Sequence, residues 1–235
     1  MRKLLAIWLG KILTIVGKTV GKKSSSSPGA YALKICPDLV KGLEKCVSKG
    51  IIVTCGTNGK TTTNNLMASA LEAKGYKVIC NKLGANMLSG IATTVLQEMS
   101  IFGKLKADYA CLEIDEAYTP IVFDYVKPDG MVITNLFRDQ LDRYGEIDIT
   151  SDIIKRAIKK VPNLKLVLNG DDPLCVQFGR EENVKAYYYG ISEKVLPQLD
   201  DTKEGRFCPV CGEEQLLSLQ SARRFLLPVV RFQAT

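Results

Sequence analysis

A glycine-rich segment with one lysine and three threonines carries the clearest chemical signal in the sequence. Its residues are Gly56, Thr57, Asn58, Gly59, Lys60, Thr61 and Thr62. Glycines allow a tight turn in which successive N–H groups, together with the amino end of a following helix, face an anion. In such a loop the lysine serves the β- and γ-phosphates of a nucleotide, and a hydroxyl reaches the bridging Mg²⁺. The segment therefore predicts a site for ATP and Mg²⁺, with Lys60 and Thr61 at the phosphates.

Acidic and amide side chains lie at or just after the ends of three other apolar runs. They are Glu113 in the run 109–114, Asn135 after 130–134, and Asn169, Asp171 and Asp172 after 165–168. Taken singly, such residues are usually turn formers. Because parallel strands end at one edge of a sheet, we expect them to lie beside the phosphate loop and bind the nucleotide. Glu113 could hold Mg²⁺, the Asn169 amide could contact adenine, and an aspartate could accept hydrogen bonds from ribose.

The elements that position these residues follow from alternating apolar runs and helical periodicities. We expect strands at 51–55, 76–80, 109–114, 130–134 and 165–168, and helices at 60–74, 90–99 and 151–160. Ser151 is expected to cap the last of these helices. Continuous apolar strands that alternate with helices are typical of parallel sheets covered on both faces. The sequence therefore predicts a P-loop three-layer α/β/α domain with a mostly parallel sheet over residues 30–200.

Residues 1–29 are predicted to form an amphipathic helix and a linker. The apolar positions at helical spacing are Leu5, Trp8, Ile12 and Ile15. Lys11 and Lys18 lie on another face, and they interrupt the apolar run that a cleaved signal peptide would need. Three interpretations remain open: a helix packed on the domain, a helix on the surface of an anionic membrane, or a cleaved signal peptide. The serine-rich stretch 22–29 is expected to be a flexible linker.

Charge and composition exclude several classes of function. Of the net charge of +7, residues 1–23 contribute +6 and residues 221–235 contribute +3, which leaves −2 between them. A near-neutral body argues against nucleic acid, and basic ends favour an anionic surface such as a membrane. The absence of histidine excludes Ser–His and Cys–His catalysis. The cysteines show no disulfide framework, which favours the cytoplasm, with the inner face of the membrane as a possible site of action.

The order of the motifs resembles the central domain of the Mur ligases. The phosphate loop is followed by Thr134 and Asn135, then by Asp139 to Asp142, and then by Asn169 to Pro173. Thr54 stands where GTPases carry a glycine, which points away from that class. Mur ligases join an amine to a carboxylate in peptidoglycan precursors, through an acyl phosphate made with ATP.

This resemblance implies roles for individual residues. Lys60 and Glu113 would be the catalytic pair, with Lys60 and Thr61 at the phosphates and Mg²⁺. Glu113 would be a Mg²⁺ ligand and Asn169 an adenine contact. Gln140 stands where most members of the family have a histidine that serves a second metal, so a second metal is not expected.

Other segments narrow the resemblance to one branch of the family. They are 81–86, 113–116, 135–145 and the pair Cys208 and Cys211. Membership of that branch implies activation of the D-glutamate α-carboxylate of lipid II and its amidation to D-isoglutamine. The ammonia would come from a partner, a GatD-type glutamine amidotransferase. Two alternatives remain open: a ligase that adds an amino acid to a UDP-MurNAc-peptide or to a folate, and an inactive ATP-binding remnant.

Residues 201–235 are expected to hold a partial zinc ribbon followed by an aberrant tail. A structural zinc site needs four ligands, and no cysteine follows Cys208 and Cys211. Zn²⁺ binding is therefore expected to be incomplete. The family's C-terminal ligase domain has no recognisable counterpart in this sequence, so we expect nucleotide binding with little amidation by this chain alone.

Overall fold

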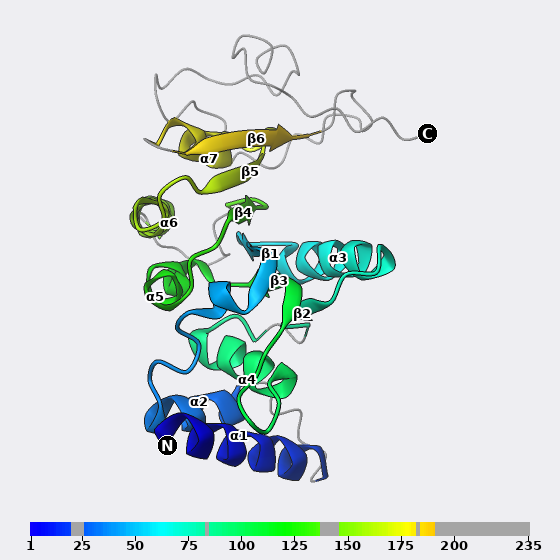
Figure 1. Cartoon of the computed structure of the whole chain (residues 1–235). Coiled ribbons are helices and arrows are strands. Elements are labelled where there is room, and N and C mark those ends of the chain that lie inside the picture. The colour runs from blue at the N-terminus through cyan, green and yellow to red at the C-terminus, as the bar shows by residue number, and fades with distance from the viewer. Residues whose placement is uncertain (20–25, 83–84, 137–145, 182–183, 191–235) are drawn as a thin grey trace.

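The computed structural model describes residues 1–19, 26–82, 85–136, 146–181 and 184–190 (Figure 1). In this part of the chain six strands form one sheet in which every pair is parallel. They are β1 Val47–Cys55, β2 Val78–Cys80, β3 Ala107–Glu113, β4 Gly130–Ile133, β5 Lys165–Asn169 and β6 Lys185–Tyr189, in the order β2-β3-β1-β4-β5-β6. The predicted α/β class with a parallel sheet is confirmed, and β6 is a strand that the sequence analysis did not anticipate.

Helices cover both faces of this sheet. The α-helices are α1 Arg2–Thr19, α2 Ser27–Ile35, α3 Lys60–Ala73, α4 Leu88–Glu98, α5 Thr119–Tyr125, α6 Glu146–Lys159 and α7 Pro173–Val176. Short 3₁₀ turns are η1 Leu43–Lys45, η2 Glu116–Tyr118 and η3 Gln177–Arg180. Figure 1 shows α3 on one side of the sheet and α5 and α6 on the other, with α1, α2 and α4 at the β2 end. The arrangement is the expected three-layer sandwich.

The central strand β1 fixes where a ligand can bind. It pairs with β3 on one side and β4 on the other, so the chain changes direction across the sheet at this strand. Ligands of open parallel sheets bind at the carboxyl ends of the strands, at such a switch point. Thr54 of β1 is in register with both Glu113 and Val132. The ends of β1, β3 and β4 therefore meet at the edge where the phosphate loop begins.

Two predicted boundaries were wrong. Helix α6 begins at Glu146, so Ser151 lies buried inside the helix and does not cap it. The linker expected over 22–29 already gives way to α2 at Ser27, where Pro28 lies in the first turn. Proline suits this position because its fixed φ matches the helix and its missing N–H would be unpaired there.

Helix α1 confirms the predicted helix near the start of the chain, but it packs through a different face from the apolar stripe. Ala6, Ile7 and Gly10 are buried, and a Cβ on Gly10 would lie 2.6 Å from Cδ1 of Leu96 in α4. Small residues at this contact let the two helices approach closely. Among the residues that the structure describes, no helix has the length and hydrophobicity to cross a membrane.

Helix α2 depends on one glycine for its contact with α4. A Cβ on Gly29 would lie 2.0 Å from the Ser89 carbonyl oxygen, and the Gly29 N–H donates to Thr93 Oγ1 at 2.9 Å. We expect Gly29→Ala to lower the free energy of unfolding by about 2 kcal/mol, because the backbone of α4 would have to move. Urea denaturation measures this loss.

The matched control for that substitution is Gly130→Ala in β4. There the nearest atom to the added Cβ lies at 3.7 Å, an ordinary contact. We expect its free energy of unfolding to stay within about 0.5 kcal/mol of the unsubstituted chain. Equal losses in the two variants would contradict the packing argument.

Candidate nucleotide-binding site

The phosphate loop lies where the sequence placed it, between β1 and α3. Gly56 has φ 122° and Gly59 has φ 80°, both in the range that favours glycine. A Cβ on Gly56 would lie 2.3 Å from Thr134 Oγ1 and 2.8 Å from the Asn135 carbonyl oxygen. Helix α3 starts at Lys60, with Gly59 as its N-cap. The loop therefore presents a helix amino end at the carboxyl edge of the sheet, as an anion site requires.

Two residues after β4 hold the loop in shape. The Asn135 side chain accepts from Asn58 N–H at 2.9 Å and donates to the Asn58 carbonyl at 3.0 Å. Thr134 Oγ1 donates to the same carbonyl at 2.7 Å, and Thr57 N–H donates to the Asn135 carbonyl at 2.8 Å. Asn135, predicted to contact the nucleotide, uses its amide to position the loop. Its contact with a nucleotide stays a prediction.

Lys60 lies folded over the loop in an ion pair that the sequence analysis missed. Its Nζ lies 3.1 Å from Glu116 Oε1 and donates to the carbonyls of Gly56 and Thr57 at 2.6 and 3.2 Å. The same Glu116 oxygen accepts from Gly56 N–H at 2.7 Å. Both side chains of the pair are only 15% exposed. The Glu116 carboxylate therefore takes up two of the donors that a phosphate would use.

Glu113 has the environment of a metal ligand. It is 3% exposed, and its Oε2 is buried without a hydrogen-bond partner among the described residues. Asn81 fixes its backbone with two bonds of 2.8 Å, one to the N–H and one to the carbonyl. A buried carboxylate oxygen without a donor is costly, and a hard cation would satisfy it. Thr61 is exposed in the first turn of α3, so a hydroxyl and a carboxylate on this edge fit Mg²⁺.

Neither Glu116 nor Asn81 was among the predicted site residues, although the sequence held signals for both. Glu116 closes an acidic cluster of Glu113, Asp115 and Glu116 immediately after a buried strand. Asn81 directly follows the end of β2. Within the described ranges, no group of three or more histidine, cysteine or acidic side chains is arranged to hold a metal. A Mg²⁺ ion at Glu113 would therefore need ligands from phosphate and water.

The residues after β5 support the loop from the other side. Asn169 Nδ2 donates to the Thr134 carbonyl at 3.0 Å, and Asn169 Oδ1 accepts from Asp171 N–H at 3.0 Å. Asp172 is buried, caps α7, and accepts from Leu136 N–H at 2.9 Å. The structure therefore places Asn169 and Asp172 against the segment that follows β4, with Asp171 between them in the chain. Their contacts with adenine and ribose stay predictions.

Burial keeps the hydroxyl and thiol groups around the loop protonated. Desolvation raises the pKa of Tyr189 to about 12, and its hydroxyl donates to the Thr134 carbonyl at 3.3 Å. Desolvation, aided by the negative charge of Glu116, raises the pKa of Cys55 well above its usual value. Cys55 is therefore a neutral core residue and not a nucleophile.

Two predicted features lie outside the described residues. One is the cysteine pair Cys208 and Cys211, for which the half zinc site stays a prediction. The other is the segment 137–145, which includes Gln140.

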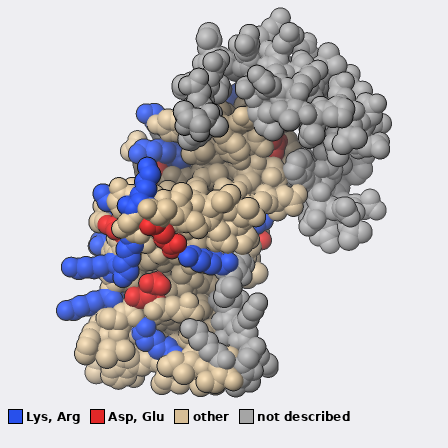
Figure 2. Space-filling view, turned by 90° about the vertical axis from the view of Figure 1, so that its right-hand side faces the viewer, with Lys and Arg blue, Asp and Glu red and all other residues tan. Residues whose placement is uncertain are grey.

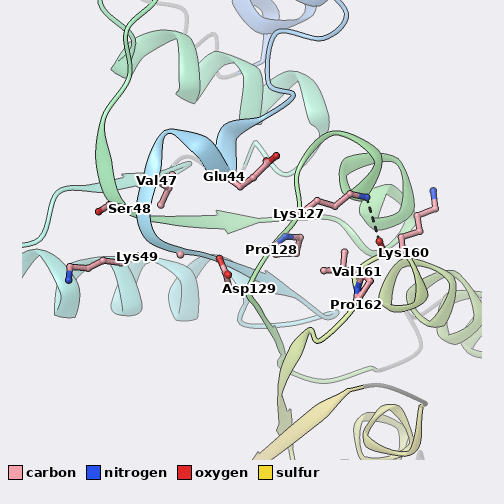
Figure 3. A pocket seen from close by; sticks show the side chains of 11 residues that line it. Glu44, Val47, Ser48, Lys49, Lys127, Pro128, Asp129, Lys160, Val161 and Pro162 are labelled. Atoms are coloured by element: carbon pink, nitrogen blue, oxygen red, sulfur yellow. Dashed lines mark hydrogen bonds between the residues drawn. The ribbon is translucent and has the colours of Figure 1, made fainter.

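A surface hollow lies at the opposite edge of the sheet (Figure 3). Its lining includes Gly50 at the start of β1, together with Lys127, Asp129 and Lys160. The Asp129 carboxylate accepts from Ile51 N–H at 2.8 Å, so it secures the strand. The hollow lies at the amino ends of the strands and takes no part in the phosphate site.

The fold and the loop define a P-loop nucleotide-binding domain, and comparison with known proteins identifies its family. Residues 53–216 match the family model for the Mur ligase middle domain. This match covers more than half of the chain. The chain therefore belongs to the Mur ligase family of ATP-dependent ligases.

Within that family the chain is a homologue of MurT. It is 37% identical over 212 residues to the MurT subunit of lipid II isoglutaminyl synthase (glutamine-hydrolyzing) of Staphylococcus aureus strain COL, a match covering 90% of this chain and 47% of that one. It is 39% identical over 189 residues to the Streptococcus pneumoniae subunit, covering 80% and 41%. The chain spans about half the length of these curated relatives.

Solved structures share the fold. MurF of Thermotoga maritima in complex with ADP superposes with a TM-score of 0.56 at 19% identity, over 68% of this chain and 36% of that one. MurF of Acinetobacter baumannii gives a TM-score of 0.55 at 16% identity, over 68% and 34%. At these identities the likeness establishes the architecture.

Because the Glu116 carboxylate bonds to two donors of the loop, we expect its negative charge to oppose phosphate binding. Glu116→Gln removes that charge but keeps an oxygen that can accept from Gly56 N–H. We expect the affinity for ADP without Mg²⁺ to rise about fivefold, because the phosphates no longer displace an ion pair of about 1 kcal/mol. Isothermal titration calorimetry measures the change.

Asp115→Asn is the matched control for Glu116→Gln. Asp115 carries the same charge nearby, but its carboxylate accepts from Ala117 N–H at 3.0 Å. We expect a smaller effect on ADP affinity from this change. Weaker binding of Mg²⁺-free ADP by Glu116→Gln would show that the carboxylate assists the phosphates, contrary to the expectation.

Proposed function

We propose that this chain supplies the ATP site of a ligase that amidates lipid II. The observation that carries the proposal is the shared edge of Lys60, the phosphate loop and the buried, unpartnered oxygen of Glu113. A cationic loop beside a carboxylate suited to Mg²⁺ fits a nucleoside triphosphate. The ADP in the T. maritima MurF structure supports this choice of ligand.

The reaction that we propose has two steps. In the first, the D-glutamate α-carboxylate of lipid II attacks the γ-phosphorus of ATP, which forms an acyl phosphate and releases ADP. In the second, ammonia attacks the acyl carbon, the bond to phosphate breaks, and the product is D-isoglutamine with inorganic phosphate. The homology to MurT, whose name specifies a glutamine-hydrolyzing synthase acting on lipid II, supports this substrate and product.

Residues of this chain have distinct parts in the first step. Lys60 would leave Glu116 and lie against the β- and γ-phosphates, where its charge stabilises the transferring group. Thr61 and Glu113 would hold Mg²⁺, which neutralises phosphate charge when bound. Thr134 and Asn135 would hold the loop in shape beside the phosphates through their bonds to Asn58.

The proposal extends to partners and domain bounds. We propose that ammonia comes from a GatD-type glutamine amidotransferase. We also propose that the complex acts at the cytoplasmic face of the membrane, where it would reach a lipid-linked substrate. The nucleotide-binding domain would occupy residues 30–200. Cys208 and Cys211 would belong to a zinc-binding insertion completed by other ligands.

Substitution of Lys60 tests the nucleotide site. We expect Lys60→Met to weaken ATP binding in the presence of Mg²⁺ about 30-fold, because a charge-assisted bond to phosphate contributes about 2 kcal/mol. Fluorescence titration with a labelled ATP analogue measures the affinity. Lys74→Met, an exposed lysine at the other end of α3, is the control and should bind as tightly as the unsubstituted chain. Equal ATP affinity of the two variants would contradict the assignment of Lys60 to the phosphate site.

A separate assay tests the chemistry. The chain is incubated with lipid II, ATP, Mg²⁺ and a GatD-type partner with glutamine, and the lipid product is analysed by mass spectrometry. The proposal expects the D-glutamate residue to become an amide, with one ADP formed per amide. ADP formation that depends instead on lysine or diaminopimelate would favour a ligase that adds an amino acid.

A further inference from the structure

Helix α1 turns a row of large apolar side chains away from the domain. Its packed face consists of the buried Ala6, Ile7 and Gly10. The opposite face carries residues that are 49 to 63% exposed. They are Leu5, Trp8, Ile12, Ile15 and Val16. In the part of the chain that the structure describes, the stripe that suggested either packing or membrane contact is therefore about half exposed, although the helix is packed.

A loop from another part of the chain extends this surface. Trp8 Nε1 donates to the Ile101 carbonyl at 2.9 Å, which holds the turn between α4 and β3 against α1. A Cβ on Gly103 would lie 3.1 Å from Ile7 Cδ1, so the turn also packs closely on the helix. Ile101 and Phe102 are 56% and 73% exposed. We call these two residues, with the five of the stripe, the apolar patch.

The charged side chains of α1, which carries most of the apolar patch, are all basic. The first 37 residues contain seven lysines and arginines and no acidic residue. Arg2 and Lys3 are exposed, and Lys11 lies in α1 between the packed face and the stripe. Figure 2 shows Lys or Arg and no Asp or Glu at the lower end of that view, where α1 lies in Figure 1. The stripe of α1 is therefore bordered by basic residues.

These properties distinguish among possible occupants. A second copy of the chain would bring two basic surfaces together, which like charges oppose. A spanning helix is excluded for α1 by its length and hydrophobicity. A helix with lysines beside an apolar face that contains tryptophan is typical of one lying in the headgroup region of an anionic bilayer.

We propose that the apolar patch and its basic border bind the surface of a membrane rich in anionic lipid. Helix α1 lies in the plane of the interface, with its stripe among the upper acyl chains and its packed face on α2 and α4. The turn at Ile101 and Phe102 inserts beside it. This inference goes beyond the nucleotide chemistry and does not rest on it.

The chain contains a built-in probe for this contact, because Trp8 is its only tryptophan. The full chain is mixed with vesicles of equal parts phosphatidylglycerol and phosphatidylcholine, or of phosphatidylcholine alone. We expect the Trp8 emission to shift to shorter wavelength with the anionic vesicles, and brominated acyl chains to quench it. Sedimentation of the vesicles should carry the chain down, and much less with the neutral vesicles.

A matched pair of substitutions separates the patch from general hydrophobicity. Ile15 in the stripe and Ile149 in α6 are 63% and 61% exposed, so neither change to glutamine should affect folding. We expect Ile15→Gln to lower the vesicle partition coefficient about fivefold and Ile149→Gln to leave it unchanged. The triple change Leu5→Gln, Ile12→Gln and Ile15→Gln should abolish binding. Lys11→Gln should weaken binding to anionic vesicles about fivefold.

Other outcomes would overturn the proposal. One is an unchanged Trp8 spectrum with either kind of vesicle. Another is equal loss of binding by Ile15→Gln and Ile149→Gln. A third is concentration-dependent self-association without lipid, detected by sedimentation velocity and accompanied by a shift of Trp8 emission to shorter wavelength, which would assign the patch to self-association. ATP binding measured on the same variants shows whether the nucleotide site is intact, so a failure of this proposal is distinguishable from a failure of the proposed function.

Discussion

The phosphate site depends on one constraint: the backbone of Asn58 is held by side chains from a different strand. Asn135 bonds both its N–H and its carbonyl, and Thr134 bonds the carbonyl again. A loop of small residues loses much conformational entropy when it is ordered. These bonds offset part of that loss by fixing the backbone of Asn58. Because the Thr134 carbonyl accepts from Asn169 and Tyr189, the ends of β5 and β6 take part in the same arrangement.

Membrane contact and nucleotide binding lie on different parts of the fold. The phosphate loop is at the carboxyl edge of the central strand, whereas α1 packs on α2 and α4 at the β2 end of the sheet (Figure 1). The proposed reaction on a lipid-linked carboxylate would use both a nucleotide site and a surface near the bilayer. Because the two surfaces are separate, the loop can use fixed polar donors while α1 uses the non-directional burial of apolar side chains.

Local patterns in the sequence predicted the parallel sheet and the phosphate loop, because both depend on periodicity and on glycine at fixed spacing. The partner of Lys60 could not be found that way. Glu116 is 56 residues away in the chain, and only the register of β1 with β3 brings it to the loop. The hydrogen bonds of Asp172 were also not predictable from its position in the sequence. Its position after a strand suggested a ligand contact, which stays a prediction, and its carboxylate accepts hydrogen bonds from the backbone.

For the helix at the start of the chain, the sequence pattern predicted the helix but not the face through which it packs. The sequence correctly predicted an apolar stripe on α1 but did not show what the stripe contacts. The face that packs on the domain is a different one and includes small residues such as Ala6 and Gly10. The Glu116 carboxylate beside the phosphate loop has a different consequence, for selectivity. An anion must compete with a charge that is already hydrogen-bonded there, so a small ion such as orthophosphate gains little by replacing it. A polyphosphate adds contacts beyond the one it displaces. On this argument the loop would favour nucleotides over small anions.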